Sequence, residues 1–267
     1  MTRLKETAQR HPLLSFVLLA YALSWWPWPC YRLDPATFDA PIFPFGPFIA
    51  AIIMLLLIGG WPAAKGWLGA IVHWRVGLRW YALALILPPA LILIATELNL
   101  MLGARLLVEV QDTAWLDLTP RFVFILLWIG LGEEPAWRGF AMPRLLDKRS
   151  ALAASLLLGA IHLVWHAPLY GVEYDLQSVW PWGLSVFCFA IVVTWMWLHT
   201  GRSLLLPMLM HAANNTAAIA WGMFSPEDQR PLWWIWAGLW VAVTATIVIA
   251  AGRNLTGRVT RRSQSAA

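Results

Sequence analysis

Long runs of apolar residues, separated by short polar or charged stretches, recur along the whole of this chain. A helix needs about 20 predominantly apolar residues to cross the hydrocarbon core of a bilayer, and eight runs approach or reach this length. The predicted spans are residues 13–30, 42–60, 79–103, 121–142, 150–170, 180–199, 203–223 and 231–251. The pattern therefore predicts an all-α polytopic membrane protein, with about eight transmembrane helices enclosing whatever polar residues the spans contain.

The composition supports this fold class. Hydrophobic residues make up 60% and charged residues 12% of the chain, whereas soluble domains carry about 25% charged residues. The first apolar run follows a basic start but lacks a small-residue cleavage pattern, so we interpret it as an uncleaved first helix. Cys30 and Cys188 lack the spacing of a metal site and lie in or beside apolar runs, which indicates buried free thiols.

The distribution of Lys and Arg predicts the orientation of the spans. With the N-terminus in the cytoplasm, 15 of the 19 basic residues, Arg138 among them, fall on that side, as the positive-inside rule requires. This topology divides the chain into a cytoplasmic N-terminus (1–12), a transmembrane domain (13–251) and a basic cytoplasmic tail (252–267). We expect a protein of the bacterial inner membrane. Its net positive charge reflects topology, and no nucleic-acid partner is expected.

The stretch between the second and third spans has a different pattern. Residues 61–78, WPAAKGWLGAIVHWRVGL, mix tryptophan with Lys, His and Arg. This mixture predicts a short amphipathic helix that lies in the cytoplasmic membrane interface.

The fourth predicted span ends in a cluster of charge. Its sequence LGEEPAWRGFAM, residues 131–142, places Glu133 and Glu134 beside an apolar run, and an ionised group near the bilayer centre costs about 2.5–3.5 kcal/mol. On a helix, Glu134 and Arg138 share a face and are expected to form an ion pair, while Glu133 points about 100° away. Pro135 is expected to start or kink a helix. Taken alone, the segment is equally consistent with an ion pair at a helix end, at headgroup level, and with a functional site.

Two later spans carry polar residues at helical spacing. His162 and His166 lie four residues apart on one helix face, a spacing that also suits ligation of one metal ion. His211 and Asn215 repeat the spacing, with Asn214 beside them. For His162 the simpler interpretation is a hydrogen bond between helices, and the same interpretation is open for His211 and Asn215 taken alone. Polar groups on three spans together favour a shared site inside the membrane.

These motifs resemble the type II CAAX prenyl endopeptidase family, also called CPBP (CAAX proteases and bacteriocin-processing enzymes) or Abi. The resemblance spans roughly residues 120–220 and includes the flanking words RGFAMPRL and GRSLLLPMLMHAANN. The chain departs from the family pattern at His162, where the family usually carries an aromatic residue, so the role of His162 is left open. The motif residues are E-E-x-x-x-R at Glu133, Glu134 and Arg138, the histidine before Ala-Pro at His166, and H-x-x-x-N at His211 and Asn215.

The resemblance implies an all-helical intramembrane endopeptidase whose site opens toward the cytoplasm. Its expected substrate is a membrane-associated peptide or protein in the lipid bilayer. Peptide hydrolysis needs a base to activate water, donors for the developing oxyanion, and a proton source for the leaving amine. We hypothesise that Glu133 and His166 position and deprotonate the water, and that His211 and Asn215 stabilise the oxyanion. The ion pair of the first motif would hold the acidic segment in place.

Metal dependence is left open by the sequence. Glu133, His166 and His211 form a possible three-ligand zinc site with an open position. A metal-free glutamate protease is the favoured interpretation, because the carboxamide of Asn215 suits an oxyanion better than a metal. Two other classes are carried as alternatives: a proton-coupled transporter with buried Glu and His as its relay, and a catalytically silent membrane scaffold or immunity protein of the same fold.

Overall fold

The computed structural model describes residues 2–38, 40–107, 114–175 and 177–256, and the regular structure within these ranges is helical. The predicted all-α fold is confirmed. The elements in chain order are α1 (Thr2–Arg10), α2 (Pro12–Trp25), α3 (Pro27–Leu33), α4 (Gly46–Ile71), α5 (Leu78–Met101), α6 (Ala114–Ile125), the π-helix η1 (Leu126–Gly130), α7 (Leu131–Glu134), the π-helix η2 (Pro135–Ala141), α8 (Met142–Leu146), α9 (Ala151–Trp165), the 3-10 helix η3 (Ala167–Leu169), α10 (Val179–His199), α11 (Leu205–Ala217), the 3-10 helix η4 (Ala218–Met223) and α12 (Pro226–Ala251).

Prolines and serine caps set several helix starts. Pro12 and Pro226 occupy the first positions of α2 and α12, where the missing N–H of proline costs no helical hydrogen bond. Ser150 accepts a hydrogen bond from the backbone of Ala153 before α9, and Ser225 caps α12 in the same way. Serine side chains at this position satisfy backbone donors that the first turn leaves free.

Within the described residues, five helical stretches are long and apolar enough to cross a membrane, and they match five of the eight predicted spans. The remaining three predicted spans, 121–142, 150–170 and 203–223, are helical too, but each is short or interrupted. The first contains two π-helices, the second ends at Trp165, and the third changes to 3-10 geometry after Ala217. These three spans carry all the candidate site residues.

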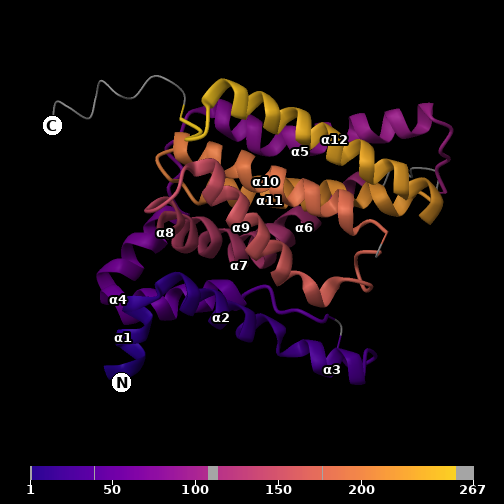
Figure 1. Cartoon of the computed structure of the whole chain (residues 1–267). Helices are drawn as coiled ribbons and strands as arrows, with labels where there is room; N and C mark the ends of the chain where they lie inside the picture. The colour runs from indigo at the N-terminus through magenta and orange to yellow at the C-terminus, as the bar shows by residue number, and fades with distance from the viewer. Residues whose placement is uncertain (1, 39, 108–113, 176, 257–267) are drawn as a thin grey trace.

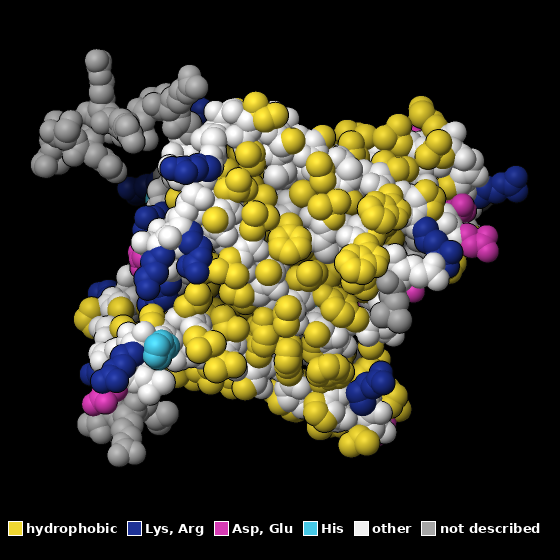
Figure 2. Space-filling model, viewed as in Figure 1, with side chains coloured by type: hydrophobic (Ala, Val, Ile, Leu, Met, Phe, Trp, Pro, Cys, Tyr) yellow, Lys and Arg dark blue, Asp and Glu magenta, His cyan; other side chains and the backbone are white. Residues whose placement is uncertain are grey.

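One end of the bundle joins segments that are far apart in sequence. Leu204 N donates to Ala70 O at 2.9 Å, and Leu152 N donates to Arg253 O at 3.0 Å. The N-terminal helix α1 and the end of α12 lie at this same end (Figure 1). Lys and Arg side chains gather there (Figure 2), so we call it the basic face. Of the predicted basic tail, residues 257–267 lie outside the part of the chain that the structure describes.

The opposite face is tied together by its own bonds. Leu107 N donates to Met223 O, and Asn99 Nδ2 donates to Asp228 O, both at 2.9 Å. Between the two faces, the surface in Figure 2 is a broad belt of hydrophobic side chains. Such a belt bounded by charge on both sides is what a bilayer requires. The chain is therefore an integral membrane protein.

The first part of the predicted interfacial stretch, residues 61–71, is helical and forms the second half of α4. At Gly60 the backbone leaves helical geometry (φ 66°, ψ −165°), and the second half of α4 turns away from the first. In this second half Ala64 and Trp67 are buried. The segment after the kink therefore packs onto the bundle through Trp67 as well as facing the interface.

Two large hydrophobic clusters fill most of the interior of the described residues, beside a small third cluster around Ala151, Ile191 and Leu255. The first joins α2 and α4 to η2, α8 and α9, and the second joins α5 and α12 to α10 and α11. In Figure 1 the α7, α9 and α11 helices lie between the α2–α4 pair and the α5–α12 pair. The candidate residues of α7 and α9 belong to the first half, and those of α11 to the second. The site therefore lies where the two halves meet.

A close contact beside the site predicts a sensitive glycine. A Cβ added at Gly132 would lie 2.7 Å from the backbone oxygen of Pro44, so Gly132→Ala is expected to lower stability by about 1–3 kcal/mol through overpacking. Gly238→Ala in α12 is the control, because a Cβ there meets nothing within 4 Å. Thermal unfolding midpoints of the purified variants in one detergent measure both effects. Equal midpoints for the two variants would contradict the close approach.

Candidate active site

The two glutamates lie on one regular turn of helix between two π-helical segments. Leu126–Gly130 and Pro135–Ala141 are both π-helical, and α7 between them carries Glu133 and Glu134. Such wide turns are rare and are often found at functional sites. Pro135 was expected to start or kink a helix, and it does begin η2, with helical backbone angles (φ −58°, ψ −37°). The chain therefore carries the acids through the bundle without a break.

Trp67 holds this irregular segment from outside. Its indole Nε1 donates to the carbonyl oxygen of Pro135 at 2.9 Å, and the bond is buried. A Cβ at Gly139 would lie 2.4 Å from the same nitrogen, so glycine at this position lets the indole approach η2. The carbonyl of Pro135 thus receives its partner from the second half of α4.

Glu134 is the most enclosed polar group of the site. Its carboxylate is 0% exposed, and Arg138 is 1% exposed. Arg138 Nη1 lies 3.1 Å from Glu134 Oε2, so the predicted ion pair is present. His211 Nδ1 donates to Glu134 Oε1 at 2.8 Å, which connects α11 to α7. The sequence analysis counted Arg138 among the cytoplasmic basic residues. Arg138 is buried beside Glu134, and its Nε and Nη2 have no hydrogen-bond partner among the described residues, so it is not a solvated charge of the kind that reports topology.

Glu133 forms a second carboxylate–imidazole pair. His162 Nε2 donates to Glu133 Oε2 at 2.7 Å. His166 does not bond Glu133. Its Nδ1 donates instead to the carbonyl oxygen of His162 at 2.8 Å, which leaves His166 Nε2 as the free ring nitrogen. The His162 ring lies among aromatic rings, 5.4 Å from that of Trp137 and 5.7 Å from that of Trp165.

A small polar pocket lies next to these pairs. Its volume is about 60 Å³, which is room for a water molecule or two rather than for a peptide. Asn214 Nδ2 donates to Asn215 Oδ1 at 3.2 Å in its wall. The lining residues are His162, His166, Tyr174, Trp182, Ser185, Val186, Phe189, His211, Asn214, Asn215 and Trp236.

The structure thus brings the six candidate residues into one neighbourhood. Glu134, Arg138 and His211 form one bonded group, and His166 and Asn215 line the adjacent pocket. His162, first interpreted as a simple interhelical hydrogen-bonding group, does bond across helices, but its partner is the candidate base. The sequence analysis missed Tyr174 and Trp182, because no helical spacing links the segment between α9 and α10 to the motifs.

A possible cation site involves His162 rather than His211. Ligand atoms of Glu133, His162 and His166 all lie within 4.8 Å of one another. The His211 ring centroid is 6.5 Å from that of His162, and His211 Nδ1 is bonded to Glu134. A carboxylate with two imidazoles fits zinc by donor type. The structure therefore groups His162, and not the predicted His211, with Glu133 and His166.

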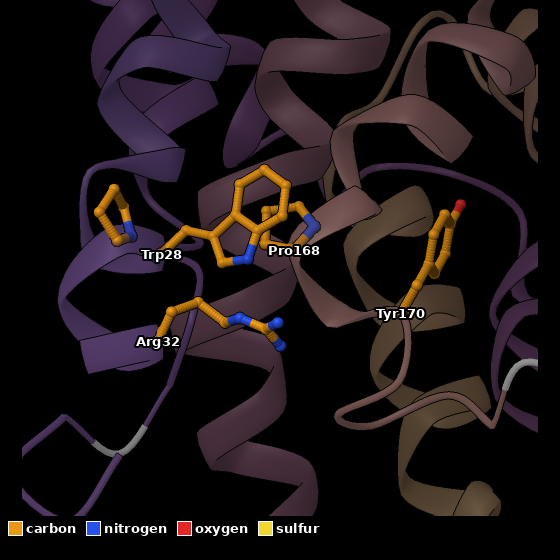
Figure 3. Close-up of a pocket in the computed structure, with 5 residues that line it drawn as sticks. Trp28, Arg32, Pro168 and Tyr170 are labelled. Carbon is orange, nitrogen blue, oxygen red and sulfur yellow. The ribbon is translucent and has the colours of Figure 1, made fainter. Parts of the chain in front are cut away.

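A larger cavity lies away from these residues. It measures about 350 Å³ and is lined by Trp28, Pro29, Arg32, Pro168 and Tyr170. Trp28 and Arg32 project from α3 toward the segment that carries Pro168 and Tyr170 (Figure 3). The candidate catalytic groups are not part of its lining, although Pro168 follows His166 by two residues.

Fold and site together define a class: an integral membrane protein whose acids, imidazoles and carboxamides meet inside a helical bundle. Comparison with known families is specific. Residues 115–217 match the family model described as type II CAAX prenyl endopeptidase Rce1-like, and this segment contains α7, α9 and α11. The family resemblance predicted from the motifs is confirmed.

A curated relative extends the match. The chain is 28% identical over 182 residues to a protein named CAAX prenyl protease 2 from Methanococcus maripaludis, an alignment that covers 63% of this chain and 67% of the relative. Together with the family match, this similarity supports a membrane protease of the CAAX endopeptidase type.

The buried ion pair predicts a non-additive effect on stability. Arg138→Gln leaves the enclosed Glu134 carboxylate without its cation, and breaking a buried pair in this way costs about 3–5 kcal/mol. The double variant Glu134→Gln/Arg138→Gln removes both charges and keeps an acceptor for His211, so part of the stability should return. Unfolding midpoints of the two single variants, the double variant and the unmodified protein form the cycle. A double variant less stable than Arg138→Gln would refute the pairing argument.

Proposed function

We propose that the protein is an intramembrane endopeptidase that hydrolyses a peptide bond of a membrane-associated protein or peptide. The observation that carries the proposal is the pair of carboxylate–imidazole contacts, Glu133–His162 and Glu134–His211, beside one small polar pocket. Such groups are expensive inside a membrane. Their grouping from three separate helices supports a chemical role.

Glu133 is proposed as the general base. Its Oε2 accepts from His162, which fixes the carboxylate and leaves the other oxygen for a water. His166 Nε2 is the free nitrogen of a ring that lines the pocket, so it accepts a hydrogen bond from that water. Glu133 takes the proton as the water oxygen attacks the carbonyl carbon. It then donates the proton to the amine nitrogen when the C–N bond breaks.

His211 and Asn215 are proposed as the oxyanion donors. The bond from His211 Nδ1 to Glu134 fixes the ring and stabilises its imidazolium form, in which Nε2–H donates to the developing negative charge. Asn215 accepts from Asn214 through Oδ1, so its amide nitrogen is free to donate. Fixed donors in an enclosed site stabilise an oxyanion at little reorganisation cost.

A zinc-dependent form of the same reaction is the second candidate, favoured by the Glu133, His162 and His166 cluster. These residues would hold the ion, and zinc would supply Lewis-acid activation of water. The metal-free form is preferred, because the carboxamide of Asn215, which lines the pocket, suits an oxyanion better than a metal ion.

The substrate and setting are proposed from the family. The relative is named CAAX prenyl protease 2, so peptides ending in a CAAX sequence, prenylated and unprenylated, are the first probes to use. The bacterial inner membrane with cytoplasmic termini is the proposed location, from the positive-inside bias. A proton-coupled transporter would instead show uptake that a protonophore abolishes, without peptide cleavage.

Glu133→Gln is expected to lower cleavage in proteoliposomes by about 10²–10⁴-fold, because the amide cannot accept the water proton. Glu227→Gln is the matched control, since Glu227 is an exposed acid in the first turn of α12 and should leave cleavage unchanged. Cleavage of a quenched fluorescent peptide, normalised to folded protein, measures both variants. Full activity of Glu133→Gln would exclude Glu133 as the base.

Chelation separates the two forms of the mechanism. For the metal-free form, we expect protein treated with EDTA and then freed of it to keep its full cleavage rate, with zinc well below one equivalent by elemental analysis. Loss of activity that zinc restores would favour the metal form. His162→Phe then locates the ion, because it lowers zinc content only if His162 is a ligand.

A further inference from the structure

The 350 Å³ cavity of Figure 3 lies at the end of a membrane span and shares no lining residue with the small polar pocket. Helices α2 and α3 together make up one candidate span, Pro12–Leu33, and Arg32 is its next-to-last residue. A span of this length just crosses the hydrocarbon core of a bilayer. Its end, and the cavity formed there, are therefore at the level of the lipid headgroups.

The polar side chains on the α3 wall of this cavity are Trp28 and Arg32, and both are hydrogen-bond donors only. They are four residues apart and so share a face of the helix. In Figure 3 the indole nitrogen of Trp28 faces the side on which the Arg32 guanidinium lies. Neither side chain makes a hydrogen bond or an ion pair with another described residue. Two uncommitted donors, one of them charged, thus line the same cavity.

The other polar groups nearby are already bonded. Asp34, two residues after Arg32, accepts a hydrogen bond from the backbone of Thr37 at 3.2 Å. The hydroxyl of Tyr170 donates to the carbonyl oxygen of Leu163 at 2.6 Å. The described residues that line the cavity include no acidic side chain. A cavity with a cation and a free N–H, but no carboxylate, fits an anion with several acceptor oxygens.

The walls of the cavity are held by the protein itself. Trp28 packs edge-on against Trp25 with ring centroids 5.9 Å apart, and Trp25 Nε1 donates to the carbonyl oxygen of Trp165 at 2.9 Å. On the other wall, the Tyr170 ring lies 5.8 Å from that of Trp182. Both walls are therefore anchored to the bundle, and a preformed site loses little conformational freedom when a ligand binds.

We propose that this cavity binds the phosphate group of an anionic phospholipid, with Arg32 and Trp28 as donors to the phosphate oxygens. Its volume is within the range of small-molecule sites. A lipid supplies this phosphate at the level of the cavity, and its acyl chains find exposed apolar side chains on the same span, such as Leu18 and Trp26. A zwitterionic lipid is disfavoured, because no carboxylate is there to pair with its ammonium group. The site does not depend on the proposed protease activity.

Native mass spectrometry of the purified protein in detergent, with added lipid, tests this site. The probes are phosphatidylglycerol, phosphatidylcholine and inorganic phosphate. Arg32→Gln removes the charge, and Trp28→Phe removes the indole donor but keeps an aromatic ring in the wall. Arg105→Gln is the matched control, because Arg105 is an exposed basic residue near the same end of the bundle and is not part of the lining.

We expect Arg32→Gln to weaken phosphatidylglycerol binding about fivefold, the effect of one basic residue at a membrane surface. Trp28→Phe should also weaken it, and Arg105→Gln should leave it unchanged. Phosphatidylcholine should bind the unmodified protein more weakly than phosphatidylglycerol, and excess inorganic phosphate should not displace the lipid. Equal affinities for Arg32→Gln and Arg105→Gln, or for the two lipids, would overturn the proposal. Displacement by inorganic phosphate would instead indicate a site for soluble anions and overturn the lipid assignment.

Discussion

The buried carboxylate of Glu134 is the contact on which the site depends. It is fully enclosed and bonded both to Arg138 on its own helical segment and to His211 on α11. An ionised carboxylate in a membrane bundle is tolerated only with such partners. Arg138 lies on η2, which belongs to the first hydrophobic cluster, and His211 lies on α11, which belongs to the second. The bonds that these two residues make to Glu134 therefore also fix how the two halves of the bundle meet. The pocket lies at that junction, so the register of α11 against α7 sets its shape.

The polar residues also account for the irregular helices that carry them. The five long apolar helices need only contact lipid and each other, whereas the site segments are π-helical, short or 3-10 at their ends. A π-turn rotates the following side chains relative to an α-helix, which lets Glu133 and Glu134 face different histidines from adjacent positions. The freed carbonyl of Pro135 then requires the indole of Trp67. Regular geometry is given up only where neighbouring side chains satisfy the backbone.

The sequence predicted the fold class, five of the eight spans as long apolar helices, and the residues that lie near one another, because apolar run length and helical spacing are local properties. It did not predict which histidine bonds Glu133, since His162 and His166 share a helix face and only the position of α9 along its axis, relative to α7, decides between them. Arg138 was counted with the cytoplasmic basic residues because charge alone does not distinguish a buried pair from a solvated one. Tyr174 and Trp182 lay beyond prediction, as their contact depends on how an irregular segment returns to the bundle.

The two carboxylate–imidazole pairs differ in a way that separates their roles. Glu134 has a second partner in Arg138, so its bonds hold α7 and α11 together. Neither glutamate is among the residues that line the pocket. Glu133 has a single bonded partner among the described side chains, His162, and keeps 3% of its surface accessible. A carboxylate with an unused oxygen beside a water-sized pocket is able to exchange a proton, whereas one with a cation and an imidazole bound is not free to move. Of these two adjacent residues, Glu134 thus holds the helices together and Glu133 is the one able to exchange a proton. The contact of Arg138 with Glu134 sets this difference.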